Sequence, residues 1–327
     1  MSPAQASDST PTAVSEPGDA TELTICGPDE ELLTALQERG LKCEVVLWDG
    51  RSEPPAGVEV AGVLIAGYAD KTFAASGLAR LPRLELIQLI SAGYDDWLPV
   101  LPPGVVLANG RGVHGASTAE LAVAGVLALV RGLPFYLSEQ AAHRWSPQHR
   151  GEISGRQVLI IGSGDIGTRI AQALEVFGAR VTPVGRKSRP GVAGIESLPE
   201  LLPQAEIVVL ALPHTPQTDR LVDDQFLAAL PDGAIVANVA RGRIVDTAAL
   251  VSHLRAGRIS AFLDVTDPEP LPPEHALWAM PNVIITPHVG GGTERWRERA
   301  VTLIADQLGR FNERRPLINV VARGSGD

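Results

Sequence analysis

Cysteine and aromatic residues are scarce in this chain of 327 residues. The two cysteines, Cys26 and Cys43, lack C-x-x-C spacing, which argues against a zinc or dithiol site and fits a reducing compartment. Aromatic residues make up only 4% of the chain, so aliphatic side chains must fill its interior. With 45% apolar residues, the chain is predicted to be globular and is long enough for two domains.

An excess of positive charge is also missing. The formal net charge is −10 and the basic residues are scattered, which disfavours nucleic acid and anionic membranes as partners. The first basic residue is Arg39, so the N-terminus lacks the charged region of a secretory signal. The longest apolar stretch, residues 121–130, is too short to span a bilayer. We therefore expect a cytoplasmic protein with no membrane partner.

What the chain does contain is a regular alternation of short apolar runs and helical stretches, typical of parallel sheets covered by helices. Residues 1–20 precede it and are predicted to be a disordered tail, because they are polar and lack apolar periodicity. The predicted strands are 23–26, 42–47, 62–66, 84–89 and 105–108, then 157–161, 180–184, 207–211, 234–238, 260–264 and 283–286. The predicted helices include 29–39, 72–80, 117–140, 168–177 and 293–311.

Two glycine clusters divide this alternation. Asn109-Gly-Arg-Gly-Val-His-Gly115 lies between the two sets of strands, and Gly290-Gly-Gly292 precedes the final helix. They are candidate hinges between two α/β domains, although tight turns would use the same residues. The helix after the first cluster is predicted to begin with a capping box formed by Ser117 and Glu120.

Gly162-Ser-Gly-Asp-Ile-Gly167 has the G-x-G-x-x-G spacing of a dinucleotide-binding turn. An apolar run leads into it, an amphipathic helix follows, and a second strand completes a βαβ unit. Gly162 permits the turn, Gly164 leaves room for the pyrophosphate and Gly167 allows close packing. The alternative is a tight turn that binds nothing. The fingerprint predicts a nicotinamide dinucleotide as cofactor.

The choice between NAD and NADP depends on residues just beyond the next strand. An acidic residue there would bind the ribose of NAD, but this chain has Gly185-Arg-Lys-Ser-Arg189. Arg186 and Lys187, or Arg189, suit a 2′-phosphate, because guanidinium groups bind phosphate through two hydrogen bonds. The alternative is a solvated basic loop. NADP is therefore favoured over NAD.

Three segments near the C-terminal end carry a cation, a carboxylate and an imidazole. Arg241, Glu269 and His288 each follow an apolar run, so they are expected at strand ends facing one cleft. Together they can hold an anion and move a proton. Taken singly, Arg241 also fits a surface ion pair, Glu269 an ordinary loop acid, and His288 a capping or packed histidine. No pair of the seven histidines has metal-ligand spacing, so no metal is expected.

The order and spacing of these motifs resemble the D-isomer-specific 2-hydroxyacid dehydrogenases. The resemblance rests on the fingerprint, Leu212-Pro-His-Thr-Pro216, Asn238-Val-Ala-Arg-Gly242, Leu263-Asp-Val265, Glu269-Pro270 and Pro287-His288. It implies an α/β fold with two Rossmann-like domains. A flavodoxin-like substrate domain would contain 21–112 and 293–327, and an NAD(P)-binding Rossmann domain would contain 113–292.

The same resemblance implies roles for individual residues. Arg241 would bind the carboxylate of a 2-oxo acid, His288 would donate a proton, and Glu269 would orient the imidazole. Ala92 and Gly93 would receive the substrate carboxylate on their backbone amides, and Asp264 would bind the nicotinamide carboxamide. The cofactor-binding residues implied are Gly162, Gly164, Asp165, Ile166, Gly167, Arg186, Lys187, Leu212, Pro213, Thr218, Val239, Ala240, Asp264, His288 and Gly290.

Departures from the family pattern bear on the substrate. Ala66-Gly-Tyr-Ala-Asp70 stands where relatives acting on phosphoglycerate often carry Arg-Ser, and Tyr94 and Trp97 add bulk near the carboxylate loop. The sequence ends shortly after the last predicted helix, so the regulatory extension of some serine-pathway relatives is not expected. Glyoxylate, hydroxypyruvate or a larger 2-oxo acid is therefore favoured over phosphohydroxypyruvate, and the loops around Tyr68 and Tyr94 are expected to select it. Glu269 argues against a formate dehydrogenase, which carries glutamine there.

Two other functions remain open at this level: a nucleotide-sensing, corepressor-like protein, and a dehydrogenase of an inorganic anion such as phosphite. The long apolar helix from Ser117 resembles the dimerisation element of the family, so a homodimer is expected. The alternative is that the helix is buried within the monomer.

Overall fold

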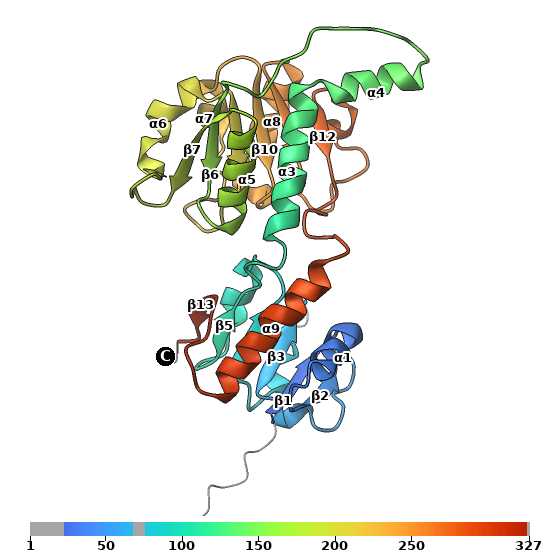
Figure 1. Ribbon diagram of the computed structural model, residues 1–327, viewed down its shortest axis with the longest axis vertical. Coiled ribbons are helices and arrows are strands. Elements are labelled where there is room, and N and C mark those ends of the chain that lie inside the picture. Colours follow the sequence, from blue (N-terminus) through green and yellow to red (C-terminus); the bar gives the residue numbers. More distant parts are fainter. Residues whose placement is uncertain (1–22, 68–75, 326–327) are drawn as a thin grey trace, which may run out of the picture.

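The computed structural model describes residues 23–67 and 76–325 and consists of two α/β lobes, each built around its own sheet (Figure 1). The predicted tail at 1–20, Tyr68 and the start of the predicted helix at 72–80 lie outside the described residues. The two-sheet α/β fold class expected from the sequence is confirmed. Each lobe has its own apolar clusters of buried residues.

The first sheet has the strand order β13-β5-β4-β3-β1-β2. Its strands are β1 (Leu23–Gly27), β2 (Cys43–Leu47), β3 (Val63–Ala66), β4 (Leu86–Leu89), β5 (Val106–Ala108) and β13 (Val320–Arg323). The parallel strands β1 to β5 have flavodoxin-like order. β13 pairs antiparallel with β5 and was not predicted, since its four half-exposed residues show no clear alternation.

Helices α1 (Glu30–Glu38) and α9 (Trp296–Asn312) pack together beside this sheet, although they lie far apart in the sequence (Figure 1). Asp29 caps α1, because its carboxylate accepts a hydrogen bond from the Leu32 amide at 2.9 Å. Buried residues of α9, including Ile304 and Leu308, join the apolar core of the first lobe. The C-terminal segment therefore returns to the lobe that the N-terminal residues build.

The second sheet has the order β12-β11-β10-β9-β6-β7-β8 and is parallel throughout. Its strands are β6 (Gln157–Ile161), β7 (Arg180–Gly185), β8 (Ala193–Gly194), β9 (Ile207–Leu210), β10 (Ala234–Asn238), β11 (Ile259–Leu263) and β12 (Val283–Ile285). Its helices are α3 (Gly115–Val130), α4 (Leu133–Ala141), α5 (Asp165–Val176), α6 (Leu198–Leu201), α7 (Asp224–Ala229) and α8 (Thr247–Arg255). The order reverses between β6 and β9, which is where doubly wound sheets bind nucleotides.

The helix predicted over 117–140 is wrong in two respects. It begins at Gly115 without a side-chain cap, because the Ser117 hydroxyl donates back to the His114 carbonyl at 3.0 Å. It also breaks, because Gly132 is left-handed (φ 65°) and Pro134 opens a new helix, α4, bent by 71° from α3. No single described helix could cross a membrane by length and composition, although this bent pair passes that test together.

The close packing of α3 on the second sheet depends on Gly125. A Cβ at this position would lie 2.3 Å from the ring of Phe262, which is buried on β11. Only glycine lets the helix and the strand approach this closely. Helix α3 therefore belongs to the second lobe through a contact that a single methyl group would disturb.

We predict that Gly125→Ala lowers the free energy of unfolding by about 1–3 kcal/mol, because the ring or the helix must shift. Denaturant unfolding would measure this. Gly309→Ala is the matched control, since only the flexible end of Arg315 comes near the Cβ position of this α9 glycine, at 4.0 Å. Alanine there should be neutral or stabilising by about 0.5–1 kcal/mol. Equal effects at both positions would contradict the packing argument.

Candidate active site

The three fingerprint glycines have different surroundings. Gly162 has φ 117°, and a Cβ there would lie 2.1 Å from the Ala211 carbonyl oxygen. A Cβ on Gly167 would lie 1.8 Å from the Gly162 carbonyl oxygen. Gly164 has no atom within 4 Å of its Cβ position. Gly162 and Gly167 are thus required by the fold, whereas the space at Gly164 can take a ligand.

Helix α5 begins directly after Gly164 and has no side-chain cap, so its first amides are available to an anion such as a pyrophosphate. The helix begins at Asp165, three residues earlier than predicted. The Asp165 carboxylate accepts from Arg169 at 2.9 Å and lies against Gly115 at the start of α3. This arrangement fits a dinucleotide whose phosphates sit over the turn.

A cleft of about 220 Å³ lies next to this turn and reaches from one lobe to the other. The second lobe contributes Gly164, Asp165, Ile166, Leu212, Pro213, Val239 and Ala240, all of them predicted cofactor residues. Ala92 and Gly93 of the first lobe, predicted to bind substrate, form its other side. Thr218 does not line this cleft; its hydroxyl donates to the Pro213 carbonyl at 2.9 Å and so holds the loop that does.

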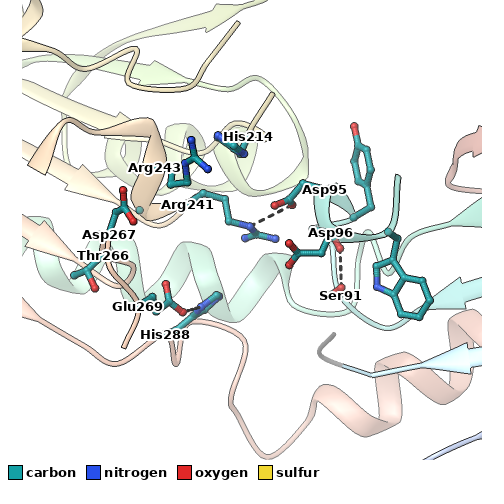
Figure 2. A pocket seen from close by; sticks show the side chains of 14 residues that line it. Ser91, Asp95, Asp96, His214, Arg241, Arg243, Thr266, Asp267, Glu269 and His288 are labelled. Carbon is teal, nitrogen blue, oxygen red and sulfur yellow. Dashed lines mark hydrogen bonds and ion pairs between the residues drawn. The ribbon is translucent and has the colours of Figure 1, made fainter. Parts of the chain in front are cut away.

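A second cavity, of about 460 Å³, adjoins the cleft and brings Arg241, Glu269 and His288 together (Figure 2). These residues follow β10, β11 and β12, whose carboxyl ends lie at one edge of the parallel sheet. Arg241 lines both the cavity and the cleft. An anion bound at Arg241 would therefore lie beside the space in which a dinucleotide fits.

Arg241 projects across to the first lobe. Its Nε lies 3.3 Å from Oδ1 of Asp95, and its Nη1 donates to the Ala240 carbonyl at 2.8 Å. Its Nη2 lies against Gly93, where a Cβ would come within 1.4 Å. Asn238 shapes the turn that carries Arg241, because its side chain donates to the Arg241 carbonyl and accepts from the Ala240 amide. Nη2 of the guanidinium thus lies next to the backbone at Gly93.

His288 and Glu269 form a hydrogen-bonded pair, with 2.5 Å between Nδ1 and Oε1. This bond from the imidazole holds the pKa of the Glu269 carboxyl below its usual range, so Glu269 is ionised at neutral pH. His288 has a left-handed backbone (φ 54°), a conformation that costs energy for a residue other than glycine. With Nδ1 bonded to the carboxylate, a proton exchanged with a ligand would have to pass through Nε2.

Asp264 has a structural role that sequence reasoning missed. It is 3% exposed, and its carboxylate accepts from the Thr286 hydroxyl at 2.6 Å and from the amides of Val289 and Gly290 at 2.9 and 3.0 Å. Its carbonyl accepts from the His288 amide at 2.7 Å. Asp264 thus holds the loop that carries His288. In the sequence, the signal for this role is an acidic residue directly after an apolar run.

A second missed group consists of His214, Asp219 and Arg243. Asp219 accepts from His214 Nε2 at 2.7 Å and from Arg243 Nε at 3.0 Å, and the bond from His214 is the main reason that its pKa is lowered. His214 lines both the cavity and the cleft, and Arg243 lines the cavity. His214 and Asp219 lie five residues apart, but Arg243 is 24 residues from Asp219, so no short motif revealed the cluster.

Comparison with known proteins identifies the family. Residues 123–290 match the family model described as "D-isomer specific 2-hydroxyacid dehydrogenase, NAD binding domain". The human glyoxylate reductase/hydroxypyruvate reductase is 33% identical over 292 residues, covering 83% of this chain and 88% of the human protein. The chain belongs to the D-isomer specific 2-hydroxyacid dehydrogenase family.

Other members of the D-isomer specific 2-hydroxyacid dehydrogenases show the extent of the likeness. A member from Xanthobacter autotrophicus, solved in complex with NADPH and MES, is 30% identical with a TM-score of 0.80, covering 92% of this chain and 98% of the other. The D-3-phosphoglycerate dehydrogenase of Mycobacterium tuberculosis is 34% identical over 281 residues, which are 82% of this chain. The present chain spans about half, 53%, of the length of that relative.

Membership of this dehydrogenase family identifies NAD(P) as the cofactor, and the open space at Gly164 fits its pyrophosphate. Arg186 and Lys187 are exposed just beyond β7. Arg189 lies nearer to the fingerprint, because its Nη2 donates to the Ser163 hydroxyl at 2.9 Å. The described part of the chain contains no group of three His, Cys, Asp or Glu side chains suited to a metal ion.

We predict that Gly164→Ala weakens NAD(P)H binding at least about tenfold while the melting temperature stays nearly constant, because the methyl group enters only the ligand space. Titration of the cofactor fluorescence would measure affinity. Gly167→Ala is the structural comparison and should lower stability, since its methyl group meets the Gly162 carbonyl. Unchanged affinity in Gly164→Ala would show that the pyrophosphate does not use this turn.

Proposed function

We propose that this family member interconverts a 2-oxo acid and a D-2-hydroxy acid with NADP(H), and that His288 is the general acid and base. One observation carries the proposal. Arg241 and the His288–Glu269 pair share a cavity that adjoins the dinucleotide cleft. A carboxylate binder, a proton donor and the cofactor would then lie within reach of the same small substrate.

Arg241 would bind the substrate carboxylate through the donors that Asp95 and Ala240 leave available. The amides of the Ala92–Gly93 loop would complete the site, since Gly93 lets the backbone approach an anion closely. The 2-oxo group would then lie between Arg241 and His288. Polarisation by the guanidinium makes its carbon a better hydride acceptor.

NADPH supplies the hydride when it is bound. In reduction, His288 Nε2 donates a proton to the oxygen of the forming alcohol. In oxidation, it removes that proton. The ionised Glu269 would accept a hydrogen bond from Nδ1 and so orient the imidazole for this transfer.

NADP is proposed over NAD because Arg186, Lys187 and Arg189 follow the second strand of the fingerprint unit, where no carboxylate is available for the ribose. Arg189 already lies across the fingerprint turn through Ser163. A 2′-phosphate would find two or three cations there.

The roles of the two lobes and the assembly of the protein are further parts of this proposal. The first lobe, with residues 21–112 and 293–327, would recognise substrate, and residues 113–292 would bind the dinucleotide.

Helix α4 and its following loop extend away from the second lobe and expose Leu133, Leu137 and Trp145 (Figure 1). We propose that they pack in a cytoplasmic homodimer, which a monomer in sedimentation would contradict.

A substrate-by-cofactor matrix tests the proposed activity. Purified protein would be assayed with glyoxylate, hydroxypyruvate and longer 2-oxo acids, each with NADPH and NADH. Consumption of the cofactor with at least one acid is expected, and the alcohol formed should have the D configuration. Absence of turnover across the whole panel would overturn the proposed function.

We predict that His288→Asn lowers kcat/KM for 2-oxo acid reduction by about 10²–10⁴-fold, because the proton donor is lost. Binding of NADPH should persist, since the fingerprint is intact. A variant that retains more than half of the wild-type kcat/KM would exclude His288 as the general acid.

Glu269→Gln tests the charge of the pair. kcat/KM for 2-oxo acid reduction should fall, because a neutral amide forms a weaker hydrogen bond with the proton-donating imidazole than a carboxylate does. In the wild type the pKa of Glu269 is lower than the normal glutamate value of 4.5. Glu269 therefore becomes protonated, and its pair with His288 is lost, only as the pH falls below 4.5. Steady-state kinetics of both proteins as a function of pH would measure the difference.

We predict that Arg186→Asp reduces the preference for NADPH over NADH by at least about tenfold, because an acid repels the 2′-phosphate and can accept the ribose hydroxyls. The ratio of kcat/KM values with the two cofactors measures it. Arg180→Asp, on the exposed start of β7, controls for charge alone. Persistence of the NADPH preference in Arg186→Asp would show that this loop does not select the cofactor.

A further inference from the structure

The cavity around Arg241 is richer in acids than a site for small acids requires. Asp95 and Asp96 lie on one side of Arg241 and Asp267 on the other, and all three line the cavity (Figure 2). Together these three residues form what we term the acidic wall. None of them has a role in the proton transfer described above, where Glu269 is already the partner of His288.

The two arginines among the described residues of the cavity are already engaged. Among the described residues that line it, Arg241 and Arg243 are the two permanent cations. Arg241 is needed for the first carboxylate of the substrate. Arg243 is bonded to both oxygens of Asp219, at 3.0 and 3.3 Å, and His214 shares that carboxylate. A second anionic group on a substrate would therefore have to compete with Asp219 for a partner.

The acidic wall lies on two sides of Arg241, so it meets a substrate that extends in either of these directions. With its carboxylate on Arg241 and Gly93, the remainder of the molecule can extend toward Asp95 and Asp96 or toward Asp267. A carboxylate stands on either side. Like charges brought together in a binding site disfavour the complex strongly, whereas a carboxylate accepts hydrogen bonds readily from hydroxyl or ammonium groups.

We propose that the acidic wall restricts the substrate to 2-oxo acids whose remainder carries no negative charge, with a preference for one that carries a hydroxyl or ammonium donor. Dicarboxylic and phosphorylated 2-oxo acids are excluded. The inference rests on the proposed function, because it presumes that Arg241 holds the reacting carboxylate. It names the substrate class by charge, which the family does not determine.

A pair of substrates that differ mainly in charge tests the wall. 2-Oxoglutarate and its 5-methyl ester differ by one negative charge and one methyl group. We expect kcat/KM to favour the ester at least about tenfold at low ionic strength. The ratio of the two kcat/KM values should decrease near 1 M salt. Asp96 is exposed to solvent, and salt screens its charge because the Debye length is then about 3 Å. A steric cause would give a preference that salt does not change.

Variants distinguish the effect of the acidic wall from that of the net negative charge of the whole protein. Asp96→Asn and Asp267→Asn should each lower the ester preference about threefold or more, and the double variant should lower it further. Glu200→Gln is the matched control, since it removes one charge from an exposed position on α6 outside the cavity. The control should leave the preference unchanged.

The outcomes distinguish this inference from the proposed function. Hydroxypyruvate serves as the reference substrate in every assay. Turnover of hydroxypyruvate together with equal kcat/KM for 2-oxoglutarate and its ester would overturn the acidic wall and leave the function intact. An unaltered preference in both asparagine variants would also overturn it. Absence of turnover with every acid would overturn the function itself.

Discussion

The parallel direction of the strands is the constraint on which the site depends. In the second sheet the carboxyl ends of β6, β10, β11 and β12 share one edge, so the residues that follow them lie together. In the first sheet, β4 and β5 end facing the same space, and Asn109 donates to the Ala92 carbonyl to hold their loops together. Residues from distant parts of the chain therefore meet without any long connecting element.

The second feature of the site is the pairing of its basic side chains with carboxylates. Arg241 and His288 are each paired with a carboxylate, Asp95 and Glu269 respectively. Glu269 fixes the imidazole through Nδ1, whereas Asp95 competes with any anion for the guanidinium. A monoanion can replace part of that pairing. A dianion would add charge to a cavity that already contains four carboxylates.

Local rules predicted the strands well. Apolar runs bounded by turn residues placed most strand ends within one or two residues, because buried parallel strands are nearly continuous apolar segments. The fingerprint glycines were also readable, since Gly162 and Gly167 have a stereochemical reason to be glycine and Gly164 leaves space for a ligand. The helix over 117–140 failed because a capping pattern and a long apolar stretch outweighed Gly132 and Pro134 in the prediction. Strand β13 was missed because its pairing with β5 is decided by contacts far away in sequence.

The sequence by itself determined the order of the elements, the dinucleotide turn and the three residue types expected to react. These features are encoded within a few neighbouring residues, as spacing, apolar character or the need for glycine. The tertiary structure alone decided which charges face each other. Asp95 opposite Arg241, Asp219 beside Arg243, and Asp264 under the His288 loop join segments that are far apart in the chain. No local pattern records such pairs, because they form only when folding brings strand ends and loops together.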